Sequence, residues 1–564
     1  MAEKSIHSTV QQHVLLCDYV IAIHILVPTS TMAPRSKRTS ASTESTSKRA
    51  KPNQSITLSK KSTQLDEDKI KSLFELADNE PLQYTDIYRQ QQLMLQTHHA
   101  TLSDKRLLKK LYYYRTPSSL NNYHVSHHSH GQLYSFGSGD MAQLGLGDDE
   151  NMRERKKPTH IKTLSDHNIV SLTCGALHNA CITSNGAVYT WGCNDDNALG
   201  RTGTADDDTA EWLPAPVDGV LGKGITSTNH SISDSVESER VVQIHAGASH
   251  TIALTSNGSV YTFGTYRDAN GVLGFTTTMN TATTPYYMQS LSESNYIIQI
   301  AAGEHHDLAL TSTGDVYQWG DIGLGQRISD RRKLQKLLPQ RVSFAHIKPT
   351  VPHIIGIYAG GHSSFAIDSE FNVYAWGPNN YGQCGVVISN KMKSSGDYIL
   401  HQPTLINTKS QCGNIIKIAA NIHHTLLLNS AGKVYALGRS DYGRLGTGNI
   451  VTSQQQHSDQ PVLVHIINEL PDNQYIVDIS CGEGHSTFVT NVGDLYTCGS
   501  GELCQLGLSE EEDVYVPTLV QGKQLENKRV VQCSAGSQHT VVLAAAEKTS
   551  PQTLTSHHNN VAGK

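Results

Sequence analysis

The chain has 564 residues, and its 45 Lys and Arg against 51 Asp and Glu give a formal net charge of −6. Hydrophobic residues make up 37% of the chain, and its 45 glycines lack the Gly-X-Y period of collagen. This composition excludes a membrane channel, a coiled coil and a collagen, and the many glycines indicate many tight turns between short strands.

Residues 1–31 hold one apolar run, Val14–Val27, which also contains Asp18 and His24. The run is shorter than the roughly 20 residues that cross a bilayer, so it predicts no membrane span. We expect the native protein to start at Met32, which would place residues 1–31 before its true beginning.

Ten cysteines are scattered along the chain, and no two of them form a C-x-x-C pair. They are too sparse for a disulfide scaffold, and the missing pairs argue against a zinc ribbon. We therefore expect reduced, mostly buried thiols in a nuclear or cytosolic protein.

Residues 1–65 are predicted to form a disordered basic tail. Within them, the Ser- and Thr-rich segment Ala33–Lys61 carries eight cations and one acid with few large apolar residues, too few to support a core. Its charge favours binding to phosphate backbones through counterion release, or recognition by nuclear import receptors. The alternative is a solvated tail without a partner. We assign chromatin binding to Arg35, Lys37, Arg38, Lys48, Arg49 and Lys51.

Residues 66–115 have apolar residues at helical spacing, including Ile70, Leu73, Leu107 and Leu111. The pattern predicts two or three helices with polar, Gln-rich faces. The segment is either a partner-binding addition or a spacer, and the sequence does not decide between the two.

From Gly131 onward one unit repeats. A turn followed closely by His or Ser recurs seven times at intervals of 54 to 72 residues. The turn residues are Gly175, Gly247, Gly303, Gly360, Asn421, Gly482 and Gly536. A period of this size is typical of a solenoid, a propeller or an array.

Each turn lies between two alternating strands, and a second turn leads to a third strand that ends in glycine, such as VYTWG at 188. This pattern is typical of short antiparallel strands. Six units are complete, the first partial unit begins at its third strand near Gly131, and the last stops after its second strand near Ala544. The two partial units add up to a seventh, as in a ring closed by pairing of N- and C-terminal strands. We predict an all-β, seven-bladed β-propeller over 128–548, with an acidic surface insertion around 204–239 and a disordered C-terminal tail at 549–564.

Several segments between the repeats resemble a known family. They include FGSGDMAQLGLG at 136, WGCNDDNALGR at 191, GTYRDANGVLG at 264 and LGRSDYGRLG at 437. Together with the repeats over roughly 400 residues, they resemble the regulator of chromosome condensation family, and within it the chromatin-bound guanine-nucleotide exchange factors for the small GTPase Ran. Other propellers with such repeats serve as ubiquitin-ligase modules, scaffolds or regulators of other small GTPases, and these remain the alternatives.

The resemblance implies a nuclear, chromatin-associated monomer that promotes GDP release and GTP loading on Ran, and so supports nucleocytoplasmic transport and mitotic assembly of the spindle and nuclear envelope. It implies no cofactor, no metal, no membrane and no covalent chemistry, with Ran, nucleosomes and nuclear import receptors as partners. The chain also lacks G-x-S-x-G, GxxxxGK[ST] and H-E-x-x-H motifs, so it shows no enzyme signature.

By the same resemblance, the segment Tyr266–Gly271 is a wedge that inserts against the phosphate-binding loop of the GTPase. The alternative is a surface turn, since Asn-Gly favours a tight hairpin in any setting. His305 and Ala248 stand where the family often has acids, which weakens the case for acids at those turns. The GTPase-binding and exchange residues that we assign are Asp140, Tyr266, Arg267, Asp268, Ala269, Asn270, Gly271, His305, His423, Arg439 and Asp441.

The segment Gln326–Arg341 is a basic loop in an otherwise acidic propeller. It is either a solvated loop or, by resemblance, a loop whose Arg331 and Arg332 meet the acidic patch of the nucleosome. The resemblance further implies that Ran binds one face of the propeller, while the other face and the tail bind chromatin.

The histidines of the repeated turns are spread around the predicted ring, whereas zinc needs ligands that converge on one ion. We expect each imidazole to satisfy backbone groups of the turn in its own blade. The turn histidines are His178, His250, His306, His424, His485 and His539, while the fifth turn places His362 one position earlier and Ser363 at the usual position.

Overall fold

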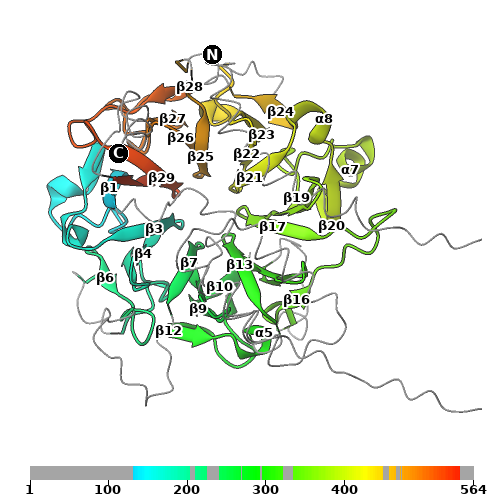
Figure 1. Cartoon of the computed structure of the whole chain (residues 1–564), viewed down its shortest axis with the longest axis horizontal. Coiled ribbons are helices and arrows are strands. Elements are labelled where there is room, and N and C mark those ends of the chain that lie inside the picture. Colours follow the sequence, from blue (N-terminus) through cyan, green and yellow to red (C-terminus); the bar gives the residue numbers. More distant parts are fainter. Residues whose placement is uncertain are drawn as a thin grey trace, which may run out of the picture. The chain divides into compact units, whose positions relative to one another are not determined.

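Each repeat of the sequence folds into one antiparallel sheet, and seven such blades surround a central axis in the described part of the chain (Figure 1). The computed structural model describes residues 131–202, 210–224, 240–268, 270–292, 295–321, 335–448, 457–464, 470–471 and 473–545. The predicted all-β, seven-bladed propeller is confirmed. The predicted basic tail, helical segment and C-terminal tail lie outside the described residues.

One blade, here called the seam, combines the two ends of the propeller. Its strands are β29 (Arg529–Ala535), β30 (His539–Ala545), β1 (Gly131–Ser138) and β2 (Glu154–His160). Strand β30 pairs with β1 at every position from Gly131 opposite Ala545 to Gly137 opposite His539. The predicted closure by N- and C-terminal strands is therefore confirmed.

The other six blades are built from strands that follow one another along the chain. The first of them contains β3 (Ile169–Cys174), β4 (His178–Thr183), β5 (Val188–Gly192) and β6 (Ala215–Pro216). The second contains β7 (Val241–Ala246), β8 (His250–Thr255), β9 (Val260–Gly264) and β12 (Ala282–Tyr287). The third contains β13 (Ile297–Ala302), β14 (His306–Thr311), β15 (Val316–Gly320) and β16 (Gln340–Arg341). The fourth contains β17 (Ile354–Ala359), β18 (Ser364–Asp368), β19 (Val373–Pro378) and β20 (Ile399–Ile406). The fifth contains β21 (Ile415–Ala420), β22 (His424–Asn429), β23 (Val434–Arg439) and β24 (His457–Leu463). The sixth contains β25 (Ile476–Cys481), β26 (His485–Thr490), β27 (Leu495–Gly499) and β28 (Val514–Leu519).

The helices among the described residues are short and lie in connections between strands. They are α5 (Gln289–Ser292), α7 (Asn390–Ser395) and α8 (Lys409–Cys412), with the 3-10 turns η2 (Glu150–Met152), η3 (Lys162–Leu164) and η5 (Asp441–Gly443). None of the described helices has the length and apolar character that a membrane crossing requires.

The hydrophobic core lies between neighbouring blades. The second strand of each blade is buried along its length, except for the last residue of β30, because both faces of the sheet are covered by other blades. Large side chains such as Phe263 and Trp319 fill the space between adjacent sheets. All nine cysteines of the described residues are free thiols, and eight of them are buried, as expected from their sparse spacing.

The strand directions give the propeller two distinct faces. The turn that joins the first and second strands of each blade lies on one face, here called the turn face. The third strand ends on the same face, since Gly192 at its end pairs with His178 at the start of the second strand. The chain enters the propeller at Gly131 and leaves it at Ala545 on the opposite face, because these two residues pair at the far end of the same strands. Loops after the third strands are thus rooted on the turn face.

Candidate functional site

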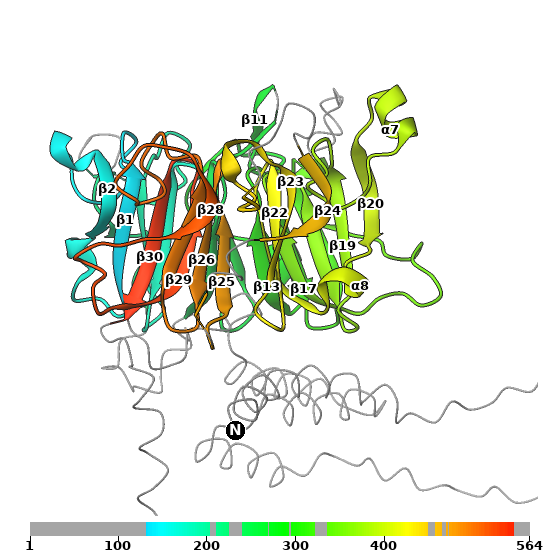
Figure 2. The same cartoon turned by 90° about the horizontal axis from the view of Figure 1, so that it is seen from above.

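A β-hairpin stands on the turn face in the blade formed by β7, β8, β9 and β12. It consists of β10 (Tyr266–Asp268) and β11 (Gly271–Gly274), which form a two-stranded sheet of their own. Figure 2 shows β11 rising above the blades. The Asn-Gly sequence predicted a tight hairpin in this segment, and the structure contains one.

Five other blades follow their third strand with a compact loop that is bonded to the next blade. A backbone carbonyl of the loop accepts a hydrogen bond from a side chain near the start of the next blade's second strand. These bonds are 2.7–2.9 Å long and join Asn179 to Gln143, Thr251 to Ala198, Thr425 to Gln383, Ser486 to Arg444 and Thr540 to Gln505. In the hairpin's blade the hairpin replaces this loop, and the corresponding residue of the next blade is Asp307, whose side chain places two carboxylate oxygens there as acceptors.

The root of the hairpin is buried. Tyr266 is 1% exposed, its hydroxyl donates to Asp307 Oδ2 at 2.5 Å, and Trp319 Nε1 donates to the same hydroxyl at 2.7 Å. His250 Nε2 lies 2.9 Å from the other carboxylate oxygen, Oδ1. Burial, reinforced by the charge of Asp307, raises the pKa of Tyr266 well above its usual value and keeps the hydroxyl a donor. The side chain of Tyr266 is thus part of the core, and its assignment to the exchange site stays a prediction.

The described residues from Arg267 to Val272 are half-buried or exposed, whereas Leu273 and Gly274 at the end of the hairpin are buried. Arg267 Nη1 lies 2.7 Å from both carboxylate oxygens of Asp196, which belongs to the preceding blade's loop. Asp268 Oδ1 accepts a hydrogen bond from the backbone N–H of Asn270 at 2.8 Å, and this bond shapes the turn. Gly271 has a φ of +113°, a conformation that favours glycine. Ala269 lies outside the described residues.

Beside the hairpin, two imidazoles and a carboxylate meet at the mouth of the central channel. The ring centroids of His305 and His362 are 6.1 Å apart, and His362 Nε2 lies 3.7 Å from Glu304 Oε2. Burial lowers the pKa of His305 to about 4, and it lowers the pKa of His362 as well. Both rings are therefore neutral near pH 7, able to donate and accept without carrying charge.

A second group of assigned residues lies two blades further along the ring. The ring of Tyr381 packs edge-on against His423, with centroids 5.3 Å apart, and it is covered by the Arg439 guanidinium at 5.3 Å. Arg439 Nη2 lies 2.7 Å from Asp441 Oδ2, and Arg444 Nη2 lies 3.3 Å from the other oxygen. Burial, with Arg444 and Arg439 adding to it, lowers the pKa of His423 to about 4.

Asp140 is exposed in the loop that follows β1, so it also belongs to the turn face. The structure thus brings the described residues of the assigned site to one face, where they form a broad surface rather than one cleft. Sequence reasoning missed Asp196, Glu304 and Arg444, which pair with or adjoin assigned residues. Asp196 directly follows Asp195, which occupies the same position of its loop as Asp140 and Asp441 do in theirs, and this neighbourhood was the signal that could have identified it.

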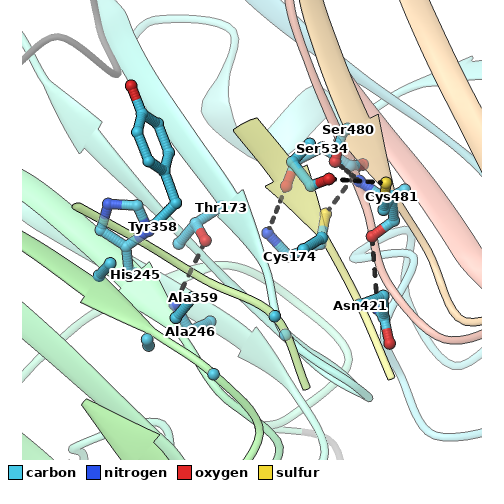
Figure 3. A pocket seen from close by; sticks show the side chains of 18 of the residues that line it. Thr173, Cys174, His245, Ala246, Tyr358, Ala359, Asn421, Ser480, Cys481 and Ser534 are labelled. Carbon is cyan, nitrogen blue, oxygen red and sulfur yellow. Dashed lines mark hydrogen bonds between the residues drawn. The ribbon is translucent and has the colours of Figure 1, made fainter. Parts of the chain in front are cut away.

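The central channel contains a cavity of about 190 Å³ lined by the first strands of the blades (Figure 3). Its walls are mainly small residues and backbone, and polar groups there bond to neighbouring blades. The backbone N–H of Cys174 donates to Ser534 Oγ at 2.9 Å, and that of Ala246 donates to Thr173 Oγ1 at 3.2 Å. This arrangement joins the blades and sets out no nucleophile with a base, so the turn face is the better candidate for function.

The turn histidines connect neighbouring blades, which corrects the prediction that they serve the turn of their own blade. Their Nε2 atoms lie 2.7–2.9 Å from side chains of the next blade: His178 with Thr251, His250 with Asp307, His306 with Ser364, His424 with Ser486, His485 with Thr540 and His539 with Asn179. The turn itself is closed by the backbone, as where Gly175 N–H donates to His178 O at 2.8 Å. Sequence spacing could not reveal a bond between residues 55 or more positions apart.

One group of described side chains has ligand atoms close enough together for a metal ion. Glu154, Cys504 and Glu511 place these atoms within 4.8 Å of one another. However, Lys156 already forms an ion pair with Glu511, and this ammonium group occupies the space where a cation would bind. The group lies outside the residues assigned to the candidate site.

The residues assigned to chromatin, including Arg331 and Arg332, lie outside the described residues. The described residue that precedes the basic loop is Asp321, which follows Gly320 on the turn face. Lys336 Nζ lies 2.9 Å from Asp321 Oδ1, so the far end of the loop returns to the same place. The basic loop is therefore rooted on the turn face, not on the face that the sequence interpretation gave to chromatin.

Glu304 gives the stability of the propeller a specific pH dependence. Burial, with the charge of Glu483 adding to it, raises the pKa of Glu304 to about 7. Because the folded protein holds this proton more tightly than the unfolded chain, stability falls as the pH rises from about 4.5 through 7. We expect Glu304→Gln to increase the free energy of unfolding by about 3 kcal/mol at pH 8 and by about 1 kcal/mol at pH 5.

Chemical denaturation of both proteins at the two pH values measures this difference. The exposed Glu526 supplies the control, since Glu526→Gln removes a carboxylate of a residue that the solvent already surrounds. Equal stabilisation by Glu304→Gln at pH 5 and pH 8 would show that Glu304 ionises as it does in water.

The fold and the turn face define a seven-bladed propeller that presents a hairpin-bearing binding surface. A family model described as RCC1-like domain matches residues 132–542, which is most of the chain. The chain belongs to this family. The regulator of chromosome condensation of Xenopus laevis is 34% identical over 434 residues, covering 74% of this chain and 92% of that protein.

Three further comparisons bear on function. The guanine nucleotide exchange factor SRM1 of Saccharomyces cerevisiae is 28% identical over 430 residues, covering 72% of this chain and 86% of that protein. The crystal structure of Prp20p from the same yeast, described with its binding properties to Gsp1p and histones, matches with a TM-score of 0.65 and 28% identity over 77% of this chain and 94% of that one. The Arabidopsis thaliana ultraviolet-B receptor UVR8 is 32% identical, covering 70% of this chain and 78% of that protein, so the family includes other activities.

Proposed function

We propose that this protein is a guanine-nucleotide exchange factor for the small GTPase Ran that works on chromatin in the nucleus. The observation that carries the proposal is the β10–β11 hairpin, which stands on the turn face in place of a compact loop. The name of the exchange-factor relative supports the same activity. The factor needs no cofactor and makes no covalent bond, because exchange requires only binding.

Exchange follows from a difference in affinity. The turn face binds the nucleotide-free GTPase better than the loaded form, so nucleotide weakens the complex and the complex weakens nucleotide binding by the same factor. The hairpin displaces the contacts that phosphate and Mg²⁺ make with the switch regions. GTP then reloads the GTPase because it is more abundant than GDP.

The charge of the turn face suits this role. Carboxylates of Asp140, Asp268 and Glu483 lie on it, together with those held in the ion pairs of Asp196 and Asp441. Carboxylates repel the phosphates of a nucleotide and attract the lysine of a phosphate-binding loop, which otherwise contacts the phosphates. The face therefore favours a GTPase from which the nucleotide has left.

Release of labelled GDP from purified Ran tests the proposal. We expect the protein to accelerate release from Ran and to leave other small GTPases near their unaided rates. Binding without accelerated release would favour the alternative of an interaction propeller, for which the family member named as a light receptor is a precedent. Acceleration on a different small GTPase would change the partner and keep the mechanism.

The chromatin association is proposed to depend on the basic tail and on Arg331 and Arg332 of the basic loop. The histone binding described for Prp20p supports it. The tail also offers a basic sequence for nuclear import receptors, in keeping with the crystal structure titled Kap60 bound to yeast RCC1. The propeller closes on itself through its seam, which agrees with a monomer.

Deletion of Ala33–Lys61 is expected to weaken binding to nucleosomal DNA and to flatten its salt dependence. Up to eight cations would no longer displace counterions, and each contributes a slope of about −0.9 in the logarithm of the binding constant against the logarithm of salt concentration. Titrations at several salt concentrations measure the slope. GDP release from free Ran serves as the control and should change little, and an unaltered slope would count against the tail as a nucleic-acid arm.

A further inference from the structure

Asp307 differs in chemistry from the residues that occupy the same position in the other blades. This position follows the turn His or Ser, and elsewhere it holds a hydroxyl or an amide: Asn179, Thr251, Ser364, Thr425, Ser486 and Thr540. Those side chains can accept a bond from one neighbour and donate to another. Asp307 is a carboxylate with no exposed surface, and it can accept only.

A buried carboxylate requires donors for both of its oxygens. Here His250 Nε2 lies 2.9 Å from Oδ1 of Asp307, and the Tyr266 hydroxyl donates a hydrogen bond to Oδ2 at 2.5 Å. Trp319 Nε1 in turn donates to the Tyr266 oxygen at 2.7 Å. The direction of every bond is therefore fixed, from Trp319 to Tyr266 and from Tyr266 and His250 to Asp307.

This network holds the hairpin at its first residue. Tyr266 opens β10, and the two-stranded β10–β11 sheet joins no other described strand. An isolated two-stranded hairpin is marginally stable in water, so its orientation depends on the groups that anchor it. Two further contacts support the hairpin: Leu273 of β11 is buried in the core, and Arg267 forms a part-buried ion pair with Asp196, of a kind that contributes little near the surface.

We propose that Asp307 is a positioning residue for nucleotide exchange, which acts by fixing Tyr266 and thereby the orientation of the hairpin on the turn face. The proposal rests on the proposed exchange function. It reaches beyond that function by assigning a role to a buried residue that no partner touches. A carboxylate stands here because the hairpin supplies a hydroxyl donor where other blades supply a carbonyl acceptor.

Three variants test the proposal: Asp307→Asn, Tyr266→Phe and the double variant. Asparagine keeps the size of the side chain and already occupies the equivalent position at Asn179, so the ring tolerates it. It supplies one acceptor oxygen where the carboxylate supplies two, so it cannot accept from both the Tyr266 hydroxyl and His250 Nε2. We expect each single variant to lower the maximal rate of GDP release roughly 10- to 100-fold, the scale on which misplaced groups reduce rates. The double variant should be no slower than the slower single variant.

The matched control is Thr540→Asn, which makes the same residue at the same position in a blade with a compact loop. Its maximal rate should stay within about twofold of the wild type, because Thr540 is distant from the hairpin and shares no partner with it. Its melting temperature shows how much stability the ring itself loses. An unchanged maximal rate in folded Asp307→Asn would overturn the proposal. Multiplying effects in the double variant would do so too, because Asp307 would then act independently of Tyr266.

Amide hydrogen exchange keeps this test separate from that of the proposed function. Amides of β10 and β11 should exchange faster in Asp307→Asn and Tyr266→Phe, while those of β26 should not. If the wild type fails to release GDP from Ran, the exchange function is wrong. Faster amide exchange in the hairpin would still establish the anchor, and unchanged protection would refute it.

Discussion

Deleting Val530–Ala544 is expected to abolish the folded propeller. The deletion removes nearly all of β29 and β30 and leaves β1 without the strand that pairs with it along its whole length. Five large side chains, Val530, Val531, Val541, Val542 and Leu543, are each at most 6% exposed. Burying side chains of this size contributes about 1.5–3 kcal/mol each, or about 8–15 kcal/mol together. That sum is comparable to the whole net stability of a typical folded protein, about 5–15 kcal/mol.

Thermal unfolding followed by circular dichroism measures the loss. The matched control removes residues 549–564, which lie beyond the last strand of the propeller, and should melt like the full chain. Cooperative melting of the 530–544 deletion near the temperature of the full chain would contradict closure through the seam.

Replacing Arg267 and Asp268 by Ala is expected to reduce GDP release from Ran about 100-fold, which corresponds to about 2.7 kcal/mol in the preference for the nucleotide-free complex. Both side chains lie on the accessible part of the hairpin, and the substitution leaves the anchor at Tyr266 in place. The stability should change little, since the Arg267 side chain is 40% exposed in its ion pair with Asp196, and pairs near the surface contribute about 0–1 kcal/mol. Release at saturating factor, measured beside a melting curve, separates the two effects.

The exposed ion pair between Arg341 and Asp315 provides a matched control, because it too joins one guanidinium and one carboxylate at the surface. Replacing both by Ala should leave release unchanged. Wild-type release from a folded Arg267 and Asp268 variant would mean that the hairpin is an ordinary surface turn, and the exchange surface would then lie near His423 and the channel mouth.

The blades and their closure could be predicted because they depend on local patterns. Alternating strands, glycine turns and two complementary half-units specify which strands exist and which ends must pair. The hairpin was also predictable from Asn270 and Gly271, whose backbone preferences act over a few residues. These features need no knowledge of how one blade sits against the next.

The contacts between blades could not be predicted in the same way. From the sequence, Tyr266 is a polar aromatic residue next to an arginine in a turn-forming segment. Nothing in that segment indicates that its hydroxyl bonds to the buried Asp307, 41 positions later. The contacts of the turn histidines were unpredictable for the same reason, since His485 bonds to Thr540 of the next blade and not to its own turn. The face on which the basic loop begins could not be predicted either, because strand direction, not charge, decides where a connection begins.

The seam also fixes when the ring can be completed during synthesis. Strands β1 and β2 are made first, but β30 follows β1 by roughly 400 residues, which takes about 20–80 s at about 5–20 residues per second. During that time β1 has β2 on one side and an unpaired edge on the other, a template to which another growing chain can pair. The six blades built from consecutive strands can form as they emerge, so the nascent protein spends this interval as an open arc in which one edge of β1 stays unpaired until the final hairpin is released.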